Sequence, residues 1–175
     1  MQAYVTEFHA ILRHATPALL ALTEAESARQ PAPGKWSPRE VIGHLIDSAS
    51  NNHQRFVRAP SQNDLVLVGY DQDQWVSLQH YQDEPWHELV TLWRAFNLHL
   101  AHVMTAVPAS DRQRRHGRHN LHEIGWKPIP ADQPATLDDL MGDYVAHLKH
   151  HLRQILGNTW DVPSQMPSIG EAARS

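Results

Sequence analysis

The sequence contains no cysteine among its 175 residues. This absence excludes disulfides, thiolate nucleophiles and cysteine-based zinc sites, so a metal site in this chain has to use His, Asp or Glu. No apolar run approaches the roughly 18 residues of a membrane-spanning helix. The N-terminal residues also lack the basic region and apolar stretch of a secretory signal. We therefore expect a cytoplasmic protein with no membrane partner.

Clustered positive charge is scarce as well. The chain has 15 Lys and Arg against 19 Asp and Glu, a formal net charge of -4, and its one basic cluster, 112–118, is short. Nucleic-acid binding needs clustered cations, so we expect no such partner. Histidine, in contrast, is abundant, with fourteen residues. Because the ordinary pKa of histidine lies near neutrality, the net charge will depend on pH.

Four segments carry apolar residues at helical spacing: 2–22, 37–59, 83–107 and 136–157. Pro17 lies inside the first segment and predicts a kink or a restart there, with Thr16 as a possible cap. Four amphipathic helices of this length bury their apolar stripes best as a bundle. The predicted fold class is therefore an all-α four-helix bundle.

Helix starts are marked by capping-box patterns. Ser37 precedes a proline and is followed three residues later by Glu40, and Thr136 begins the same pattern. The connection 60–82 is long enough to cross the bundle, so the second and third helices are expected to run parallel. We predict one domain, 1–160, followed by a flexible tail, 161–175.

His147 and His151 are one helical turn apart, which stacks their side chains about 6 Å from each other on one face. With fourteen histidines, ~1 such pair is expected by chance, so spacing alone is weak evidence. A helical wheel is more informative, because it places both rings at the border of the apolar face. The alternative is that both belong to a histidine-rich surface.

On the second helix, His44 lies at the edge of the apolar face, in line with Ser48, Asn51 and Arg55. If the second and fourth helices are antiparallel, His44 lies at the depth of the other two histidines, roughly 10 Å from the same end of the bundle. The pattern thus predicts a three-histidine metal site. The alternative for His44 is a core-edge residue bonded to a carbonyl group, and a second site in the 116–122 loop is disfavoured.

Two stretches carry a family resemblance. Residues 34–48, GKWSPREVIGHLIDS, resemble the second-helix signature of the DinB-like superfamily, most closely its YfiT-type metalloenzymes. Residues 144–155, YVAHLKHHLRQI, are similar to the second motif of that family. Further similar positions run from the end of the second helix into the connection to the third: Arg55-Phe56, Tyr70-Asp71 and Trp75.

The resemblance covers about 5–157 and implies a four-helix bundle with a long crossover, usually a homodimer. It also implies nickel, zinc or a similar ion, held by one histidine of the second helix and two of the fourth. Carried over by position, these are His44, His147 and His151. The chain departs from the family in its His/Arg-rich loop, 112–134, so the substrate mouth is expected to differ.

Three histidines without a carboxylate leave coordination positions open, as catalytic ions require. One resulting chemistry is transfer of a low-molecular-weight thiol to an electrophile, which the resemblance implies because several DinB-like proteins are thiol transferases that use bacillithiol, mycothiol or glutathione. The second is hydrolysis by water activated at the ion. A third reading is a non-catalytic stress protein that binds metal or ligand. We favour thiol transfer to a small-molecule substrate, because Ser48, Asn51 and Arg55 are placed to orient a carboxylate; for Arg55 the alternative is a structural ion pair.

Overall fold

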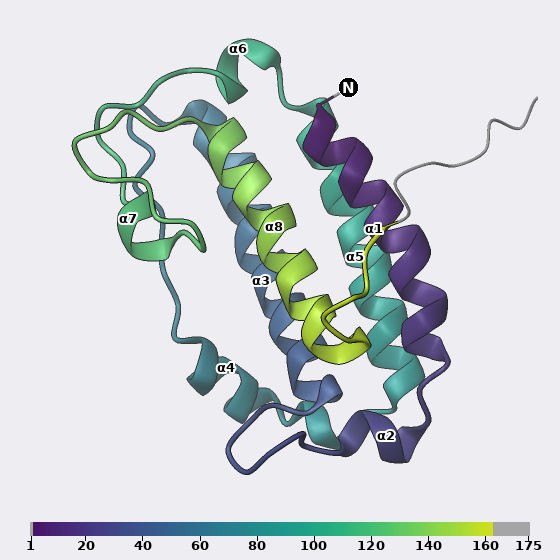
Figure 1. The fold of residues 1–175 in the computed structure, drawn as a ribbon. Helices are drawn as coiled ribbons and strands as arrows, with labels where there is room; N and C mark the ends of the chain where they lie inside the picture. The colour runs from purple at the N-terminus through teal and green to yellow at the C-terminus, as the bar shows by residue number, and fades with distance from the viewer. Residues whose placement is uncertain (1, 163–175) are drawn as a thin grey trace, which may run out of the picture.

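The computed structural model describes residues 2–162, and within that range the chain is mostly helical and forms no β-strand. Four long helices form a bundle (Figure 1): α1 (Ala3–Leu20), α3 (Pro38–Arg58), α5 (Trp86–Ala106) and α8 (Leu137–Leu156). The predicted fold class is confirmed. Shorter helices lie in the connections: α2 (Glu24–Ala28), η1 (Ala59–Ser61), α4 (Gln72–Gln79), η2 (Tyr81–Asp83), α6 (Ala109–Arg112) and α7 (Leu121–Ile124).

Capping boxes begin α3 and α8, as the sequence predicts. The Glu40 carboxylate accepts the backbone N–H of Ser37 at 2.7 Å, while the Ser37 hydroxyl accepts from the Glu40 backbone N–H. Thr136 and Asp139 form the same reciprocal pair. Each box satisfies N–H groups that have no partner within the helix. The first residue of each helix is thereby fixed, and with it the direction of each helical face.

Helix α1 continues through Pro17 to Leu20, so the expected restart and cap are wrong. The Thr16 hydroxyl does not cap a new helix but donates to the Leu12 carbonyl oxygen at 2.6 Å. Pro17 lies in the last turn, where its missing N–H removes a single helical hydrogen bond close to the end of the helix. That cost is too small to interrupt a helix whose apolar face is already buried.

The helices follow the order α1, α5, α3, α8 around the bundle, each packing on the next. Figure 1 shows α3 and α5 running in the same direction, with α1 and α8 opposite to them. The chain between α3 and α5 returns along the outside of α3 and carries α4 and η2. The predicted long crossover is confirmed, and it leaves α3 and α8 as antiparallel neighbours.

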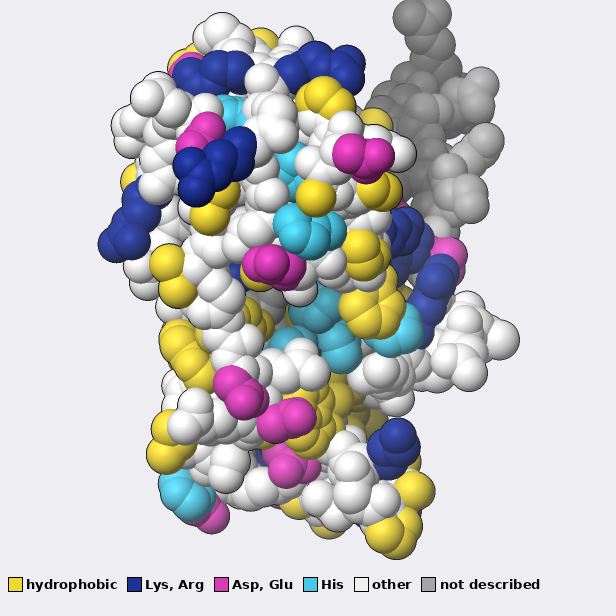
Figure 2. All heavy atoms as spheres, turned by 90° about the vertical axis from the view of Figure 1, so that its left-hand side faces the viewer, with side chains coloured by type: hydrophobic (Ala, Val, Ile, Leu, Met, Phe, Trp, Pro, Cys, Tyr) yellow, Lys and Arg dark blue, Asp and Glu magenta, His cyan; other side chains and the backbone are white. Residues whose placement is uncertain are grey.

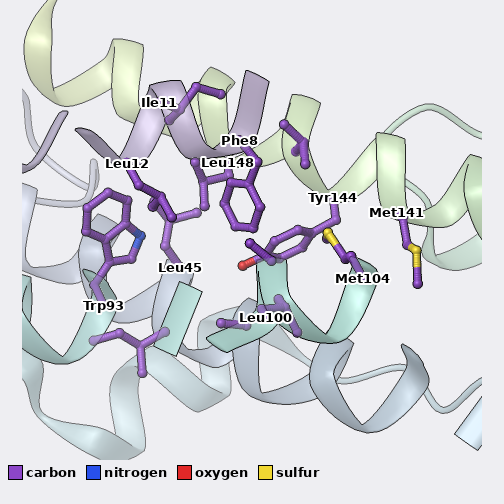
Figure 3. Close-up of a cluster of buried hydrophobic side chains, with 14 of the residues drawn as sticks. Phe8, Ile11, Leu12, Leu45, Trp93, Leu100, Met104, Met141, Tyr144 and Leu148 are labelled. Atoms are coloured by element: carbon purple, nitrogen blue, oxygen red, sulfur yellow. The ribbon is translucent and has the colours of Figure 1, made fainter. Parts of the chain in front are cut away.

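Large apolar side chains from the four long helices fill the centre of the bundle (Figure 3). The rings of Phe8 and Tyr144 pack edge to face with centroids 5.7 Å apart, a geometry that the charge distribution of aromatic rings favours. The buried Tyr144 hydroxyl donates to the Asn97 side-chain oxygen, which satisfies both polar groups. Tyr144 precedes His147 on α8, so this packing also fixes the rotation of the helix that carries the two histidines.

One side-chain cluster fastens the crossover to α3. The Tyr81 ring lies against the backbone at Gly43, where an added Cβ would be 2.0 Å from the ring. The Tyr81 hydroxyl donates to the Asp47 carboxylate at 2.6 Å, and Gln79 donates to the same oxygen. Burial raises the pKa of Asp47, and these two hydrogen bonds oppose the rise. Asp47 therefore holds the crossover in place.

The His/Arg-rich loop is attached to the same crossover through hydrogen bonds to carbonyl groups. His116 Nδ1 lies 2.9 Å from the Asn63 carbonyl oxygen of the crossover. His119 Nε2 lies 2.7 Å from the Gln133 carbonyl oxygen, a contact within the loop itself. The Arg114 guanidinium donates to carbonyl groups that follow the last turn of α3, those of Ala59, Pro60 and Gln62. The loop is thus a structural brace built from polar side chains.

Of the predicted C-terminal tail, 161–175, the structure describes residues 161 and 162; the remainder, 163–175, lies outside the described residues. Within the described part, Asp161 forms ion pairs with Lys149 at 2.8 Å and Arg153 at 2.7 Å. Among residues 2–162, no helix combines the length and the apolar character needed to cross a membrane.

Candidate metal centre

The three predicted histidines meet between α3 and α8. His44 lies in the second turn of α3, while His147 and His151 lie one turn apart on the facing side of α8. One ring nitrogen from each residue can be chosen so that all three lie within 4.8 Å of one another. Figure 2 shows histidine side chains gathered in a hollow of this face of the molecule. The antiparallel arrangement therefore brings together residues that are more than a hundred positions apart in the sequence.

The ring geometry fits a shared ion. The Nε2 atoms of His44 and His147 are 3.2 Å apart. For metal–nitrogen bonds of about 2.0–2.1 Å, this separation corresponds to an angle of roughly 100° at the ion, within the range of a four-coordinate site. The His151 ring centroid lies 4.7 Å from that of His44 and 4.5 Å from that of His147. In this arrangement the three imidazoles surround a space that a single cation would fill.

All three imidazoles are held in the neutral form, which is the metal-binding form. Burial, followed by repulsion from His151, lowers the pKa of His44 to about 3. Burial, followed by repulsion from neighbouring histidines, lowers the pKa of His147 to about 2. Burial also lowers the pKa of His151, against a hydrogen bond with Gln154. At neutral pH the site therefore presents lone pairs and no positive charge.

Neighbouring side chains fix the orientation of the rings. His151 Nδ1 lies 2.9 Å from the Gln154 side-chain oxygen, a contact that makes Nδ1 the donor and leaves Nε2 as the free lone pair. The Trp36 ring packs on His44 with centroids 5.1 Å apart. His44 Nδ1 is buried and has no hydrogen-bond partner among the described residues. The rings are thus positioned by packing as well as by hydrogen bonding.

A cavity of about 450 Å³ opens beside the histidines. Its wall on α3 includes two of the predicted substrate-binding residues, Ser48 and Arg55. The third, Asn51, is not among the lining residues: its amide donates to the Asp47 carbonyl oxygen, and Asn52 lines the cavity instead. The residues of α3 that line the cavity therefore lie slightly to one side of the stripe that the helical wheel predicts from His44 through Asn51 to Arg55. The sequence did not indicate this small rotation around the helix axis.

The mouth of the cavity is formed by α7 and the turn after it. The Asp143 carboxylate of α8 accepts the backbone N–H groups of Trp126 and Lys127, both at 2.8 Å. This anchor places the Trp126 ring over the histidines, with centroids 5.6 Å from His147 and 4.4 Å from His150. Neither Trp126 nor Asp143 was predicted, since no spacing relates the mouth segment to α8.

Within residues 2–162, the His44, His147 and His151 cluster is the one group of three or more metal-ligating side chains close enough to share an ion. In the loop that offered a second possible site, His116 and His119 are instead directed at carbonyl groups, and His122 lies 3.5 Å from the Glu123 carboxylate. His99 and His102 are exposed on α5, with ring centroids 6.3 Å apart.

Residues 8–155 match the DinB superfamily. The chain belongs to this superfamily. The family membership predicted from the two helical motifs is confirmed, and the match includes residues of all four long helices.

Individual members of the DinB superfamily are distant in sequence. "Putative metal-dependent hydrolase YfiT" of Bacillus subtilis is 28% identical over 123 residues, which cover 70% of this chain and 63% of YfiT. A protein of Oceanobacillus iheyensis with the same description, OB0782, is 27% identical over 122 residues, which cover 70% of this chain and 64% of that protein. The aligned part thus spans less than two thirds of each relative.

The fold is shared with a solved structure. YfiT from Bacillus subtilis, which is described as having an unusual four-helix bundle topology, superposes with a TM-score of 0.70. The sequence identity is 19%, and the superposition covers 87% of this chain and 81% of YfiT. Metal-dependent relatives and a cluster of three histidines together support a divalent metal in this chain.

Proposed function

We propose that this chain is a metal-dependent enzyme whose ion, nickel or zinc, is held by His44, His147 and His151 at the inner end of the cavity. The observation that carries the proposal is the convergence of three neutral imidazoles beside a space large enough for a small-molecule substrate. The three histidines would fill three coordination positions, so at least one position remains for a reactant. When bound, such an ion lowers the pKa of a coordinated thiol or water.

Transfer of a low-molecular-weight thiol to an electrophile is the reaction we propose. Among the described residues that line the cavity there are two acids, and neither is placed as a free general base. Both carboxylate oxygens of Asp143 accept backbone N–H groups, and Glu123 is exposed at the mouth. A coordinated thiol loses its proton without such a base, whereas attack by water on an amide benefits from one.

The protein's own groups would bind and orient the thiol compound. Ser48 and Arg55 lie on the same wall as His44, and Tyr70, which also lines the cavity, lies within hydrogen-bond reach of Ser48. Burial raises the pKa of Tyr70 to about 12, so its hydroxyl stays a hydrogen-bond donor. Asn51 stays a predicted contact. The expected homodimer and cytoplasmic location likewise stay predictions.

Hydrolysis is the second candidate, favoured by the descriptions of the DinB relatives as metal-dependent hydrolases. A chromogenic electrophile separates the two reactions. Nickel- or zinc-loaded protein is incubated with bacillithiol, mycothiol or glutathione, and adduct formation that His44→Ala abolishes is the expected result. Turnover of a chromogenic ester in the absence of any thiol would show that the reaction is hydrolysis and not thiol transfer. Retained metal with neither activity would identify a binding protein.

A further inference from the structure

The α3 wall of the cavity carries a buried cation without an acidic partner. The Arg55 side chain is 8% exposed, and among residues 2–162 it forms no ion pair. Its Nε and Nη2 donate to the Val68 carbonyl oxygen at 3.3 and 2.7 Å, and Nη1 makes a long contact of 3.4 Å with the Asn52 side chain. A guanidinium has five N–H groups, so these contacts leave donors over.

The acids near Arg55 are engaged elsewhere. Asp143 is held by backbone amides of the mouth, and Glu123 lies beside His122 with 3.5 Å between the closest atoms. Asp47, which acts electrostatically on Tyr70, is held by Tyr81 and Gln79. Burying an uncompensated charge is costly, and a cavity that does so is prepared for a ligand of opposite charge.

The distance between Arg55 and His44 along α3 determines how long a ligand must be to reach both. Arg55 follows His44 by eleven residues on α3, which places both on nearly the same face and roughly 16 Å apart along the helix axis. Long side chains on a helix lean toward its N-terminus, which shortens the span to about 10–15 Å. Ser48 and Asn52 lie between the two positions and add polar groups to the same wall.

We infer that Arg55 is a carboxylate-binding residue, and that the substrate of this site is an extended anionic molecule. Its carboxylate lies on the free edge of the Arg55 guanidinium, and its reactive group lies at the histidine end of the cavity. The planar fork of the guanidinium matches a carboxylate in two parallel hydrogen bonds. Placement of the reactive end rests on the proposed function, whereas the carboxylate site does not.

Dicarboxylic acid monohydroxamates test both ends of the cavity. The adipic, suberic and sebacic compounds are compared with their methyl esters by isothermal titration calorimetry, on zinc-loaded and on metal-free protein. In both forms the acid should bind about tenfold more tightly than its ester, equivalent to about 1.4 kcal/mol. With zinc present, the suberic or sebacic compound should bind more tightly than the adipic one, because the shortest chain does not reach both ends.

Arg55→Gln should remove the preference for acid over ester, and Arg55→Lys should retain part of it. Arg58→Gln is the matched control, since it removes the same charge from an exposed position outside the cavity on α3 and should leave the preference unchanged. Thermal melting of each variant checks that the Val68 contact is not needed for folding. Equal binding of acid and ester by the unmodified protein, or a preference that survives in Arg55→Gln, would overturn the inference.

The same titrations separate this inference from the proposed function. If the histidines hold no ion, zinc adds nothing to hydroxamate binding and His44→Ala has no effect, but the preference for the acid persists. If Arg55 serves only to hold Val68, zinc strengthens binding of acid and ester equally.

Discussion

Two histidine-rich regions of this molecule use the same side chain in opposite ways. In the bundle, His44 and His147 direct their Nε2 atoms at each other across 3.2 Å, beside His151. In the loop, His116 and His119 are each directed at a separate carbonyl oxygen. Both pairs are largely buried, so burial does not distinguish them. What distinguishes them is whether a polar partner within the chain already occupies the ring nitrogens.

A ring nitrogen bonded to a carbonyl group has to carry a proton, so it stabilises the fold and offers no lone pair. Ring nitrogens that face one another, as those of His44 and His147 do, direct at least one lone pair at a shared space in which a cation can bind. The comparison predicts that changes in the bundle alter metal binding, while changes in the loop alter stability alone.

Removing one bundle histidine should have the largest effect, which is a loss of zinc affinity. His147→Ala should lower zinc affinity by more than the roughly 100-fold that loss of an outer-shell partner costs, since a direct ligand is lost. Competition with a chromophoric chelator measures the affinity, and elemental analysis of untagged protein gives the stoichiometry. His119→Ala is the control and should bind one ion per chain as before. Full zinc affinity in His147→Ala would remove the distinction between the two regions.

Acid should have the next largest effect, which is a loss of folding stability in the metal-free protein. The pKa of His44 is lowered to about 3 and that of His147 to about 2, so the unfolded chain binds more protons than the folded one below pH ~6.5. Stability is therefore complete above that pH and is lost as the pH falls toward these values. Each histidine contributes up to roughly 1.4 kcal/mol per pH unit.

Urea unfolding of metal-free protein between pH 7 and pH 4 measures this loss. His44→Asn should reduce the slope of stability against pH, whereas His102→Asn, at an exposed position on α5, should leave it unchanged. Identical slopes in the two variants would show that the buried imidazoles are not the source.

Loss of the partner that orients a bundle histidine should have a smaller effect. Gln154→Ala removes the acceptor of His151 Nδ1 and should lower zinc affinity by roughly 10-fold, because the ring is then free to rotate and change tautomer. Chelator competition again measures the change. Gln54→Ala, at an exposed position on α3, should leave affinity unaltered. A Gln154→Ala protein with unchanged affinity would mean that packing alone orients His151.

The loop should respond least, and in stability only. His119→Ala removes the contact with the Gln133 carbonyl oxygen and the acceptor of the Leu121 N–H, and should lower the free energy of unfolding by about 1–2 kcal/mol. Urea unfolding measures it, with zinc stoichiometry determined on the same sample. A loss of bound zinc in this variant would assign the loop a role in the metal site.

The sequence was sufficient to predict the bundle, the crossover and the positions of three histidines, because each depends on local rules. Capping boxes at Ser37 and Thr136 fix where two helices begin, and antiparallel packing then brings His44 to the level of His151. Asn51 and Asn52 show the limit of such rules. A difference of tens of degrees around α3 decides which amide faces the cavity, and that rotation is set by the segments packed against the helix.

Tyr70, Trp126 and Asp143 show a second limit. They reach the site from three separate segments, and the contact between Asp143 and the amides after α7 joins positions that no periodicity relates. Pro17 shows the converse, since a strong local signal is overridden where the apolar face of α1 is already buried.

The position of Trp126 has a practical consequence. Its indole is 44% exposed and stacks near His150 with ring centroids 4.4 Å apart, beside the histidine cluster. A paramagnetic cation such as nickel or copper, entering the cluster, would quench the emission of this indole and of Trp36, which packs on His44, more than that of the tryptophans buried deeper in the bundle. Tryptophan fluorescence would therefore report metal binding at the histidines without an added label. The variant Trp126→Phe would show how much of the change in emission comes from Trp126.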